Sequence, residues 1–125
     1  MRRTCTTCSG IEPDVSNKPK VKGTSWESQV AACLQANGWP QAERRALSGS
    51  LDRGDIAGLP TVIEAKACNG WCPAEWIKEL EAEMANAGQD TGAVWIKRRG
   101  RTDPLQSYVL MPAYVFLRLL SRAES

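Results

Sequence analysis

Residues 54–66 read GDIAGLPTVIEAK: a carboxylate, a turn, and an apolar run that carries two charged residues. The β-branched residues that follow the Gly-Leu-Pro turn predict a strand over residues 61–67. Glu64 and Lys66 are two positions apart in it, so their side chains leave the same face of the strand. An apolar strand rarely carries charge without a reason, and this pair therefore marks a candidate site.

Asp55 precedes the turn, and its place in the chain lets it join the pair. If residues 55–57 form a short antiparallel strand against residues 61–66, Asp55 comes opposite Glu64, and two carboxylates and an ammonium meet at one spot. Hard oxygen ligands suit Mg²⁺ or Mn²⁺, and a nearby ammonium suits an anionic, phosphate-like transition state. The alternative is a plain ion pair of Glu64 with Lys66 on a wet face of the sheet.

The chain has 125 residues, which is the size of one domain. Its net charge is only +2, but residues 75–83 hold four Glu against one Lys, which leaves the rest of the chain more basic. Clustered basic residues are compatible with a polyanion such as DNA, and equally with a solvated face. The clusters are Arg2-Arg3, Lys18/Lys20/Lys22, Arg44-Arg45, and Lys97-Arg98-Arg99 with Arg101.

The chain contains no histidine, which excludes Ser-His and Cys-His nucleophilic catalysis and zinc sites with His ligands. Any catalysis must use carboxylates, lysine, arginine and metal. No stretch approaches the roughly 20 apolar residues that span a bilayer, and the N-terminus lacks the apolar core of a signal peptide. These features predict a soluble, cytoplasmic protein with no membrane partner.

Hydrophobic periodicity and turn residues predict the order α-β-β-β-α-β-β-α, which one mixed sheet with helices packed on it satisfies. Residues 1–22 are polar and without period, and they are predicted to be a flexible or zinc-linked tail, while residues 23–125 form the domain. The first helix is expected to start at a capping box, Thr24 to Glu27, and to end at Asn37-Gly38. The other expected elements are strands over residues 39–47, 55–57, 61–67, 93–97 and 108–111, and helices from 73 to about 87 and over 112–122.

An Asp, a spacer, and Glu-x-Lys on an apolar strand resemble the active-site motif of the PD-(D/E)XK nuclease superfamily. The resemblance implies an α/β fold with a restriction-endonuclease-like core, a mixed β-sheet built in the order α-β-β-β-α-β and flanked by helices. It implies that Asp55, Glu64 and the backbone carbonyl of Ala65 hold one or two Mg²⁺ or Mn²⁺ ions. Lys66 would position the attacking water or steady developing charge. Gly54 stands where the family name has a proline.

A second resemblance is to archaeal-type Holliday junction resolvases. It is carried by Lys22-Gly23 before the first helix, and by Arg44-Arg45 and the Ser48-Gly49-Ser50 loop after it. The resemblance implies that Glu27 is a further metal-site carboxylate. The implied DNA contacts are Arg44 or Arg45 near the scissile phosphate, and Ser48 or Ser50 as the loop serine. For Glu27 the alternative is a helix cap, because it stands three residues after Thr24.

Residues 23–120 as a whole are similar to small endonucleases or resolvases of actinobacterial phages. The shared pieces, in order, are Glu-Arg-Arg-Ala-Leu, Gly-Asp-Ile-Ala-Gly, the Glu-x-Lys strand, an acidic helix, and Lys-Arg-Arg-Gly-Arg before a terminal Met-Pro helix. The basic residues of the last piece follow a strand, which places them at a sheet edge or hairpin tip. Phosphate contact is the favoured role over a solvated turn for Lys97, Arg98, Arg99 and Arg101.

Five cysteines is an odd number, and in a reducing compartment they are expected to be thiols or metal ligands. Cys5 and Cys8 form half of a zinc site, and Cys68 and Cys72 could supply the other half of a four-thiolate site that pins the tail. The alternatives are a decayed finger or completion by a second subunit. Cys33 is expected to be a buried core thiol.

Together these features predict a Mg²⁺-dependent DNA endonuclease, a phage Holliday junction resolvase that cuts four-way junctions by symmetric nicks. The resemblance implies a homodimer, because two scissile strands related by twofold symmetry call for two sites. One alternative is a PD-(D/E)XK nuclease that acts on other branched or duplex DNA. The other is a catalytically inactive DNA-binding module of the same fold.

Overall fold

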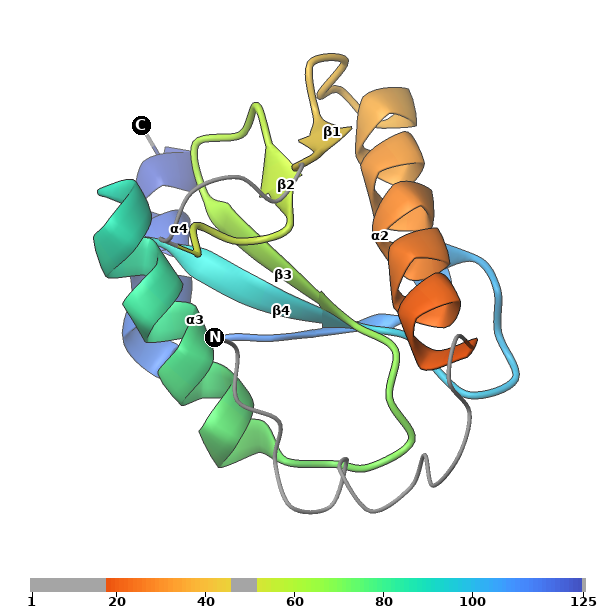
Figure 1. Cartoon of the computed structure of the whole chain (residues 1–125). Helices are drawn as coiled ribbons and strands as arrows, with labels where there is room; N and C mark the ends of the chain where they lie inside the picture. Colours follow the sequence, from red (N-terminus) through yellow and green to blue (C-terminus); the bar gives the residue numbers. More distant parts are fainter. Residues whose placement is uncertain (1–17, 46–51, 125) are drawn as a thin grey trace.

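The computed structural model describes residues 18–45 and 52–124, and within these ranges the side chains from residue 25 onward. Two helices, α2 and α3, lie on opposite sides of a small sheet, and a third, α4, packs next to α3 (Figure 1). No helix in these ranges is both long and apolar enough to cross a bilayer.

The element order agrees with the predicted α-β-β-β-α-β-β-α pattern, and the fold is mixed α/β. Helix α2 (Lys18–Ala36) is followed by the strands β1 (Glu43–Arg44), β2 (Ile56–Ala57) and β3 (Val62–Lys66). Then come helix α3 (Pro73–Ala87), strand β4 (Gly92–Ile96), the 3₁₀ turn η1 (Pro104–Gln106), strand β5 (Tyr108–Leu110) and helix α4 (Ala113–Glu124).

The strands of the described ranges form two small sheets, where one mixed sheet is expected from the sequence. In the three-stranded sheet the central strand β4 is parallel to β3 and antiparallel to β5, and Glu64 is paired with Val94. Helix α3 is the crossover that a parallel pair of strands requires. The strands β1 and β2 make a separate antiparallel ladder, in which Arg44 lies opposite Ile56.

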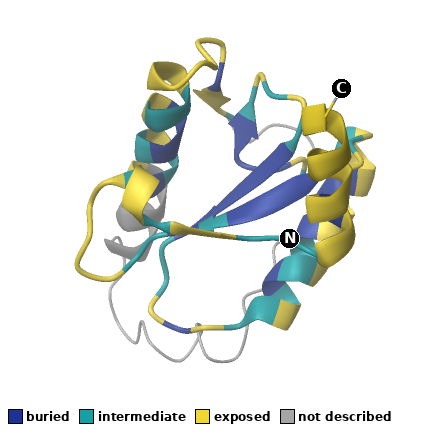
Figure 2. Cartoon of the chain, turned by 180° about the vertical axis from the view of Figure 1, so that it is seen from behind, coloured by how far each residue is buried: buried dark blue, intermediate teal, exposed yellow. Residues whose placement is uncertain are grey.

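The two faces of β3 are buried in two different core clusters, because strand side chains alternate between faces. Ile63 and Ala65 belong to the cluster under α2, and Val62 belongs to the cluster under α3. Glu64 and Lys66 share the face of Val62 and therefore lie toward α3. Figure 2 shows β3 buried along its length. The largest apolar partners are Trp26 and Val30 in the first cluster, and Trp76, Leu80 and Val115 in the second.

The first helix begins earlier than the sequence predicts. Helix α2 starts at Lys18, so Thr24 lies inside the helix and is not its N-cap, and the prediction that Glu27 completes a capping box is wrong. Pro19 is compatible with this start, because a proline in the first helical turn lacks an N–H group that would have no helical partner. The domain boundary expected at residues 22–23 falls within α2.

Both ends of the second helix are confirmed. Helix α3 starts at Pro73, and it ends at Gly88, whose φ of 68° is the left-handed conformation that glycine adopts readily. The N–H groups of Gly88 and Gln89 donate to the carbonyls of Ala85 and Met84, which closes the helix. The strand expected over residues 39–47 is shortened to β1 in the described residues, and positions 46–51 lie outside them.

Candidate functional site

Glu64 and Lys66 form a buried charged pair under α3. Glu64 has no solvent exposure and Lys66 is 8% exposed. The Nζ atom of Lys66 lies 3.7 Å from Oε2 of Glu64. The alternative of an ion pair on a wet sheet face is therefore wrong, because α3 covers this face. Two charges held in such a position need further polar partners to offset their desolvation.

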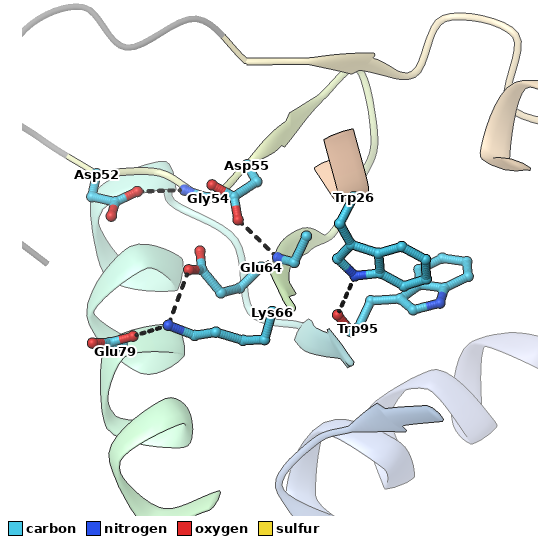
Figure 3. Close-up of polar contacts among 9 residues, drawn as sticks. Trp26, Asp52, Gly54, Asp55, Glu64, Lys66, Glu79 and Trp95 are labelled. Atoms are coloured by element: carbon cyan, nitrogen blue, oxygen red, sulfur yellow. Dashed lines mark hydrogen bonds and ion pairs between the residues drawn. The ribbon is translucent and has the colours of Figure 1, made fainter. Parts of the chain in front are cut away.

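Helix α3 supplies two of these partners, Glu79 and Glu83. Nζ of Lys66 donates to Oε1 of Glu79 at 3.0 Å, so the ammonium lies between the carboxylates of Glu64 and Glu79 (Figure 3). Glu83 follows one helical turn later, on the same side of the helix, and is only 2% exposed. The acidic helix noted in the sequence therefore points part of its negative charge at the sheet.

A cluster of three carboxylates, from Asp52, Glu64 and Glu83, is the strongest candidate for a metal site in the described residues. Each offers one oxygen, and these oxygens all lie within 4.8 Å of one another. The three residues come from the loop before β2, from β3 and from α3. Carboxylate oxygens are the ligands that Mg²⁺ and Mn²⁺ prefer, and a divalent cation would balance the charge gathered here.

Gly54 explains how Asp52 reaches the cluster. Gly54 has a φ of 96°, which proline cannot adopt, so a proline before Asp55 is incompatible with this loop. A Cβ at Gly54 would lie 2.8 Å from Cγ1 of Val62, which leaves no room for a side chain. The N–H group of Gly54 donates to Oδ1 of Asp52 at 3.1 Å, a local turn that orients the Asp52 carboxylate (Figure 3).

Asp55 lies next to β3, as expected, but through different contacts, and it is buried. Its N–H group donates to the carbonyl of Ile63 at 2.8 Å, and its Oδ2 accepts from the N–H of Ala65 at 2.8 Å. The side-chain carboxylate of Asp55 thus accepts the hydrogen bond from the N–H of Ala65 that a backbone carbonyl would accept in a regular antiparallel pair of strands. The expected pairing of residues 55–57 with β3 is replaced by the β1–β2 ladder, because β1 takes the hydrogen bonds of Ile56 and Ala57.

The predicted metal ligands are only partly brought together. Glu64 belongs to the cluster of three, and Asp55 and Ala65 are joined to each other by their hydrogen bond. Glu27 lies elsewhere: its Oε1 accepts from Nε of Arg44 at 3.1 Å, and it is not a member of the cluster found among the described residues. The role of Glu27 as a metal ligand stays a prediction.

The two candidate arginines have different environments. Arg44 pairs with Glu27, and 43% of its side chain is exposed. Arg45 is half-buried, and its N–H group donates to the carbonyl of Asp55 at 2.7 Å, which ties this arginine to the loop that carries the site. The loop serines Ser48 and Ser50 lie outside the described residues.

The basic turn after β4 lines a pocket that begins one residue beyond Lys66 of the charged pair. The pocket has a volume of about 540 Å³ and lies where β3 and β4 end. The N–H of Lys97 donates to the carbonyl of Lys66 at 2.8 Å, which joins the basic turn to the strand of the site. Its lining residues are Ala67 to Trp71, Ile96 to Gly100, and Tyr108. Of the four predicted phosphate contacts, Arg101 is exposed and lies outside this lining.

The cysteines only partly follow the prediction. Cys33 and Cys68 are not part of a disulfide, and both are half-buried, so Cys33 is less buried than expected. Burial raises the pKa of the Cys33 thiol, and the nearby Asp103 carboxylate adds to the rise. Cys72 is disulfide-bonded, contrary to the expectation of thiols and metal ligands alone, and a zinc site would require this cysteine to be reduced. Cys5 and Cys8 lie outside the described residues, and the zinc site stays a prediction.

Three site residues are absent from the sequence-based set: Asp52, Glu79 and Glu83. Asp52 stands three positions before Asp55 in the same loop, and Glu79 and Glu83 are four positions apart in the most acidic segment of the chain. The helical spacing indicates that the two glutamates share a face. It does not say that this face meets β3, which depends on how the helix packs.

Comparison with known proteins finds no matching protein-family model, no matching curated protein and no matching solved structure.

Proposed function

We propose that this chain is a divalent-metal-dependent DNA endonuclease, and that its substrate is the four-way DNA junction. The observation that carries the proposal is the carboxylate cluster of buried Glu64 and Glu83 with half-buried Asp52, whose three oxygens lie within 4.8 Å of one another, beside the Lys66 ammonium. Carboxylates and a lysine are the groups that a metal-assisted attack on a phosphodiester uses. The likeness of the Asp, Glu-x-Lys motif to PD-(D/E)XK nucleases supports the same activity.

Mg²⁺ or Mn²⁺ is the proposed ion, and Glu64 its central ligand. Glu64 belongs both to the set implied by the motif and to the cluster of three. Asp52 and Glu83 are the proposed partners of Glu64, and the Asp55 carboxylate and the Ala65 carbonyl remain predicted ligands next to them. The bound ion would polarise a phosphate oxygen and lower the pKa of the attacking water.

Lys66 is the group proposed to serve the phosphate directly. Its Nζ is held 3.0 Å from Glu79 and 3.7 Å from Glu64, which fixes the position of the ammonium. There it would orient water and offset the negative charge that develops on the phosphate oxygens in the transition state. Attack of the water oxygen on phosphorus breaks the bond to the 3′-oxygen, which takes up a proton. The products are 5′-phosphate and 3′-hydroxyl ends.

The basic residues near the site are proposed to hold the DNA backbone. Arg99 and Arg101 are exposed on the turn after β4, and Arg44 is exposed on β1. Contacts of this kind give affinity that falls with salt but carry no base specificity. Recognition of a branched shape does not need base specificity, which suits a junction substrate.

A homodimer is the proposed assembly, with α4 as its interface. A symmetric four-way junction has two equivalent scissile strands, and a twofold dimer presents one site to each. Helix α4 leaves an apolar surface that a second copy of the chain would cover. The exposed apolar residues of this surface are Tyr114, Phe116, Leu117, Leu119 and Leu120.

The test is cleavage of a mobile four-way junction and of a linear duplex of matched sequence, with Mg²⁺ present. Paired symmetric nicks on the junction are expected from the natural protein. Asp55→Asn, Glu64→Gln and Lys66→Ala are each expected to reduce cleavage by about 10²-fold or more, in line with the loss of an electrostatic or metal-holding group. Glu81→Gln is the matched control, because Glu81 is exposed on the same helix as Glu79 and Glu83.

Three outcomes would contradict the proposal. If the natural protein cleaves neither DNA, the proposed nuclease activity is wrong. If the Glu64→Gln protein cleaves the junction as well as the natural protein does, the proposed site is wrong. Efficient cleavage of the duplex would keep the nuclease and replace the junction as its substrate.

A further inference from the structure

The pocket at the ends of β3 and β4 has the size of a ligand site. Its volume of about 540 Å³ lies within the range of roughly 300–1,000 Å³ that is usual for small-molecule sites. One wall is residues 67–71, which begin directly after Lys66, and the opposite wall is residues 96–100 after β4. The lining of this pocket therefore begins at the residue that follows the proposed catalytic lysine in the sequence.

Two aromatic rings stand at this pocket with much of their surface exposed. Trp71 is 56% exposed, and Tyr108 is 51% exposed. Trp71 is braced from behind by the buried Trp76, with ring centroids 5.3 Å apart and planes at 81°. An edge-to-face contact of this kind leaves a ring face available, and exposed aromatic rings are the usual stacking platforms for nucleobases.

The charged side chains that line the pocket within residues 18–45 and 52–124 are all positive. Lys97, Arg98 and Arg99 contribute three cations, and no carboxylate of these ranges is in the lining. Lys97 lies over the ring of Trp26, at 5.9 Å from its centroid, and Arg98 lies over the ring of Tyr108, at 5.3 Å. These contacts hold two of the cations in place. The pocket thus combines a surface for an aromatic ring with a surface for an anion.

We propose that this pocket binds one unpaired nucleotide of a DNA strand, with its base stacked on Trp71 or Tyr108 and its phosphate against Arg98 and Arg99. The inference rests on the proposed function and deepens it, since it makes the substrate a strand with an unstacked nucleotide close to the scissile phosphate. Nucleotides at a branch point are unstacked at lower cost than those within a continuous duplex.

The test compares a labelled duplex that has one bulged adenine with the same duplex in which the bulged position is abasic. Binding is measured by fluorescence anisotropy with Ca²⁺ in place of Mg²⁺, so that the DNA stays intact. The natural protein is expected to bind the adenine bulge about tenfold more tightly, which corresponds to one base–aromatic stack. The double variant Trp71→Ala/Tyr108→Ala is expected to bind the two DNAs equally.

Two control variants keep the outcome specific. Trp71→Phe retains an aromatic ring and should retain the preference. Trp39→Ala removes another exposed tryptophan that does not line the pocket, and it should also retain the preference. Equal binding of the two DNAs by the natural protein, or a preference that survives in the double variant, would overturn the inference. If the inference is overturned but the natural protein still nicks junctions with Mg²⁺, the proposed nuclease function stands and only the role of the pocket is lost. A natural protein that binds neither DNA contradicts both the pocket and the proposed function.

Discussion

Glu64 shows how the surroundings of one residue give a weak sequence motif its chemical meaning. A Glu-x-Lys triplet by itself is compatible with a surface ion pair. In the structure Glu64 is fully buried, its oxygens lie near those of Asp52 and Glu83, and Lys66 is 3.7 Å away. Burying this much charge without compensation costs several kcal/mol, so the cluster should bind a cation more strongly than exposed carboxylates do.

Removal of one cluster member is predicted to weaken metal binding. Glu83→Gln keeps the shape of the side chain but removes one negative charge, so the affinity for Mn²⁺ should fall by roughly tenfold or more. Isothermal titration calorimetry with Mn²⁺ measures this, with Glu81→Gln as the control on the exposed side of the same helix. If Glu83→Gln leaves the affinity for Mn²⁺ unchanged, Glu83 is not a ligand, and Asp55 and Glu64, the pair that the motif implies, become the favoured ligands.

At the scale of elements, α3 completes the site because it crosses from β3 to the parallel strand β4. The crossover lays its inner face on the sheet, where Trp76 and Leu80 enter the core and Glu79 and Glu83 reach the charged residues of β3. Helix α4 is attached more loosely. Apart from Val115 its residues are exposed, and polar contacts hold its second half.

Asp90 provides those contacts to α4. Its backbone carbonyl accepts from Arg118 at 2.7 Å, and its carboxylate accepts from Arg122 at 2.5 Å. The hydrogen bond from Arg122 lowers the pKa of the Asp90 carboxyl below its usual value of 3.8. A carboxyl with a lowered folded-state pKa stabilises the fold above its unfolded pKa, and this contribution is lost as the pH falls through the folded value.

Asp90→Asn is therefore predicted to lower the melting temperature slightly at pH 7, by about 1–2 °C, since about half of each side chain of the Asp90–Arg122 pair is exposed to solvent and salt. The difference from the natural protein should disappear at an acidic pH below the lowered pKa of the Asp90 carboxyl, where this carboxyl is protonated and as neutral as the asparagine amide. Thermal unfolding followed by circular dichroism at the two pH values checks this. Glu124→Gln, an exposed carboxylate on α4, should show no difference at pH 7.

At the scale of the whole molecule, the basic pocket and the exposed apolar residues of α4 lie on different elements. The basic pocket, which includes the exposed rings of Trp71 and Tyr108, is formed where β3 and β4 end, away from the apolar residues that α4 exposes. A dimer formed through α4 would therefore leave the basic pocket of each copy uncovered. In the proposed dimer this separation would let each chain act on one strand of a symmetric substrate.

Leu117→Glu together with Leu120→Glu is predicted to convert the proposed dimer to a monomer. Both leucines are at least half exposed, so the change should leave the fold intact while it places two like charges on each side of the interface. Light scattering after size exclusion should give twice the mass of one chain for the natural protein and the mass of one chain for the variant. A monomeric natural protein would contradict the assembly.

The local sequence is enough to predict features that depend on neighbouring residues. Pro73 and the Asn86-Ala87-Gly88 segment mark the ends of α3, and the two-residue period of β3 puts Glu64 and Lys66 on one face, because both signals act over a few residues. A local signal can also mislead. The capping box at Thr24 predicts a helix start that the structure moves to Lys18.

The membership of the carboxylate cluster depends on tertiary structure alone. Asp52, Glu64 and Glu83 come from a loop, a strand and a helix, and their oxygens meet within 4.8 Å only because α3 packs on the β3–β4 pair. The same packing buries Lys66 against Glu79. Sequence periodicity states which side chains share a face of one element, but the face that two elements press together is chosen by the packing of the whole core.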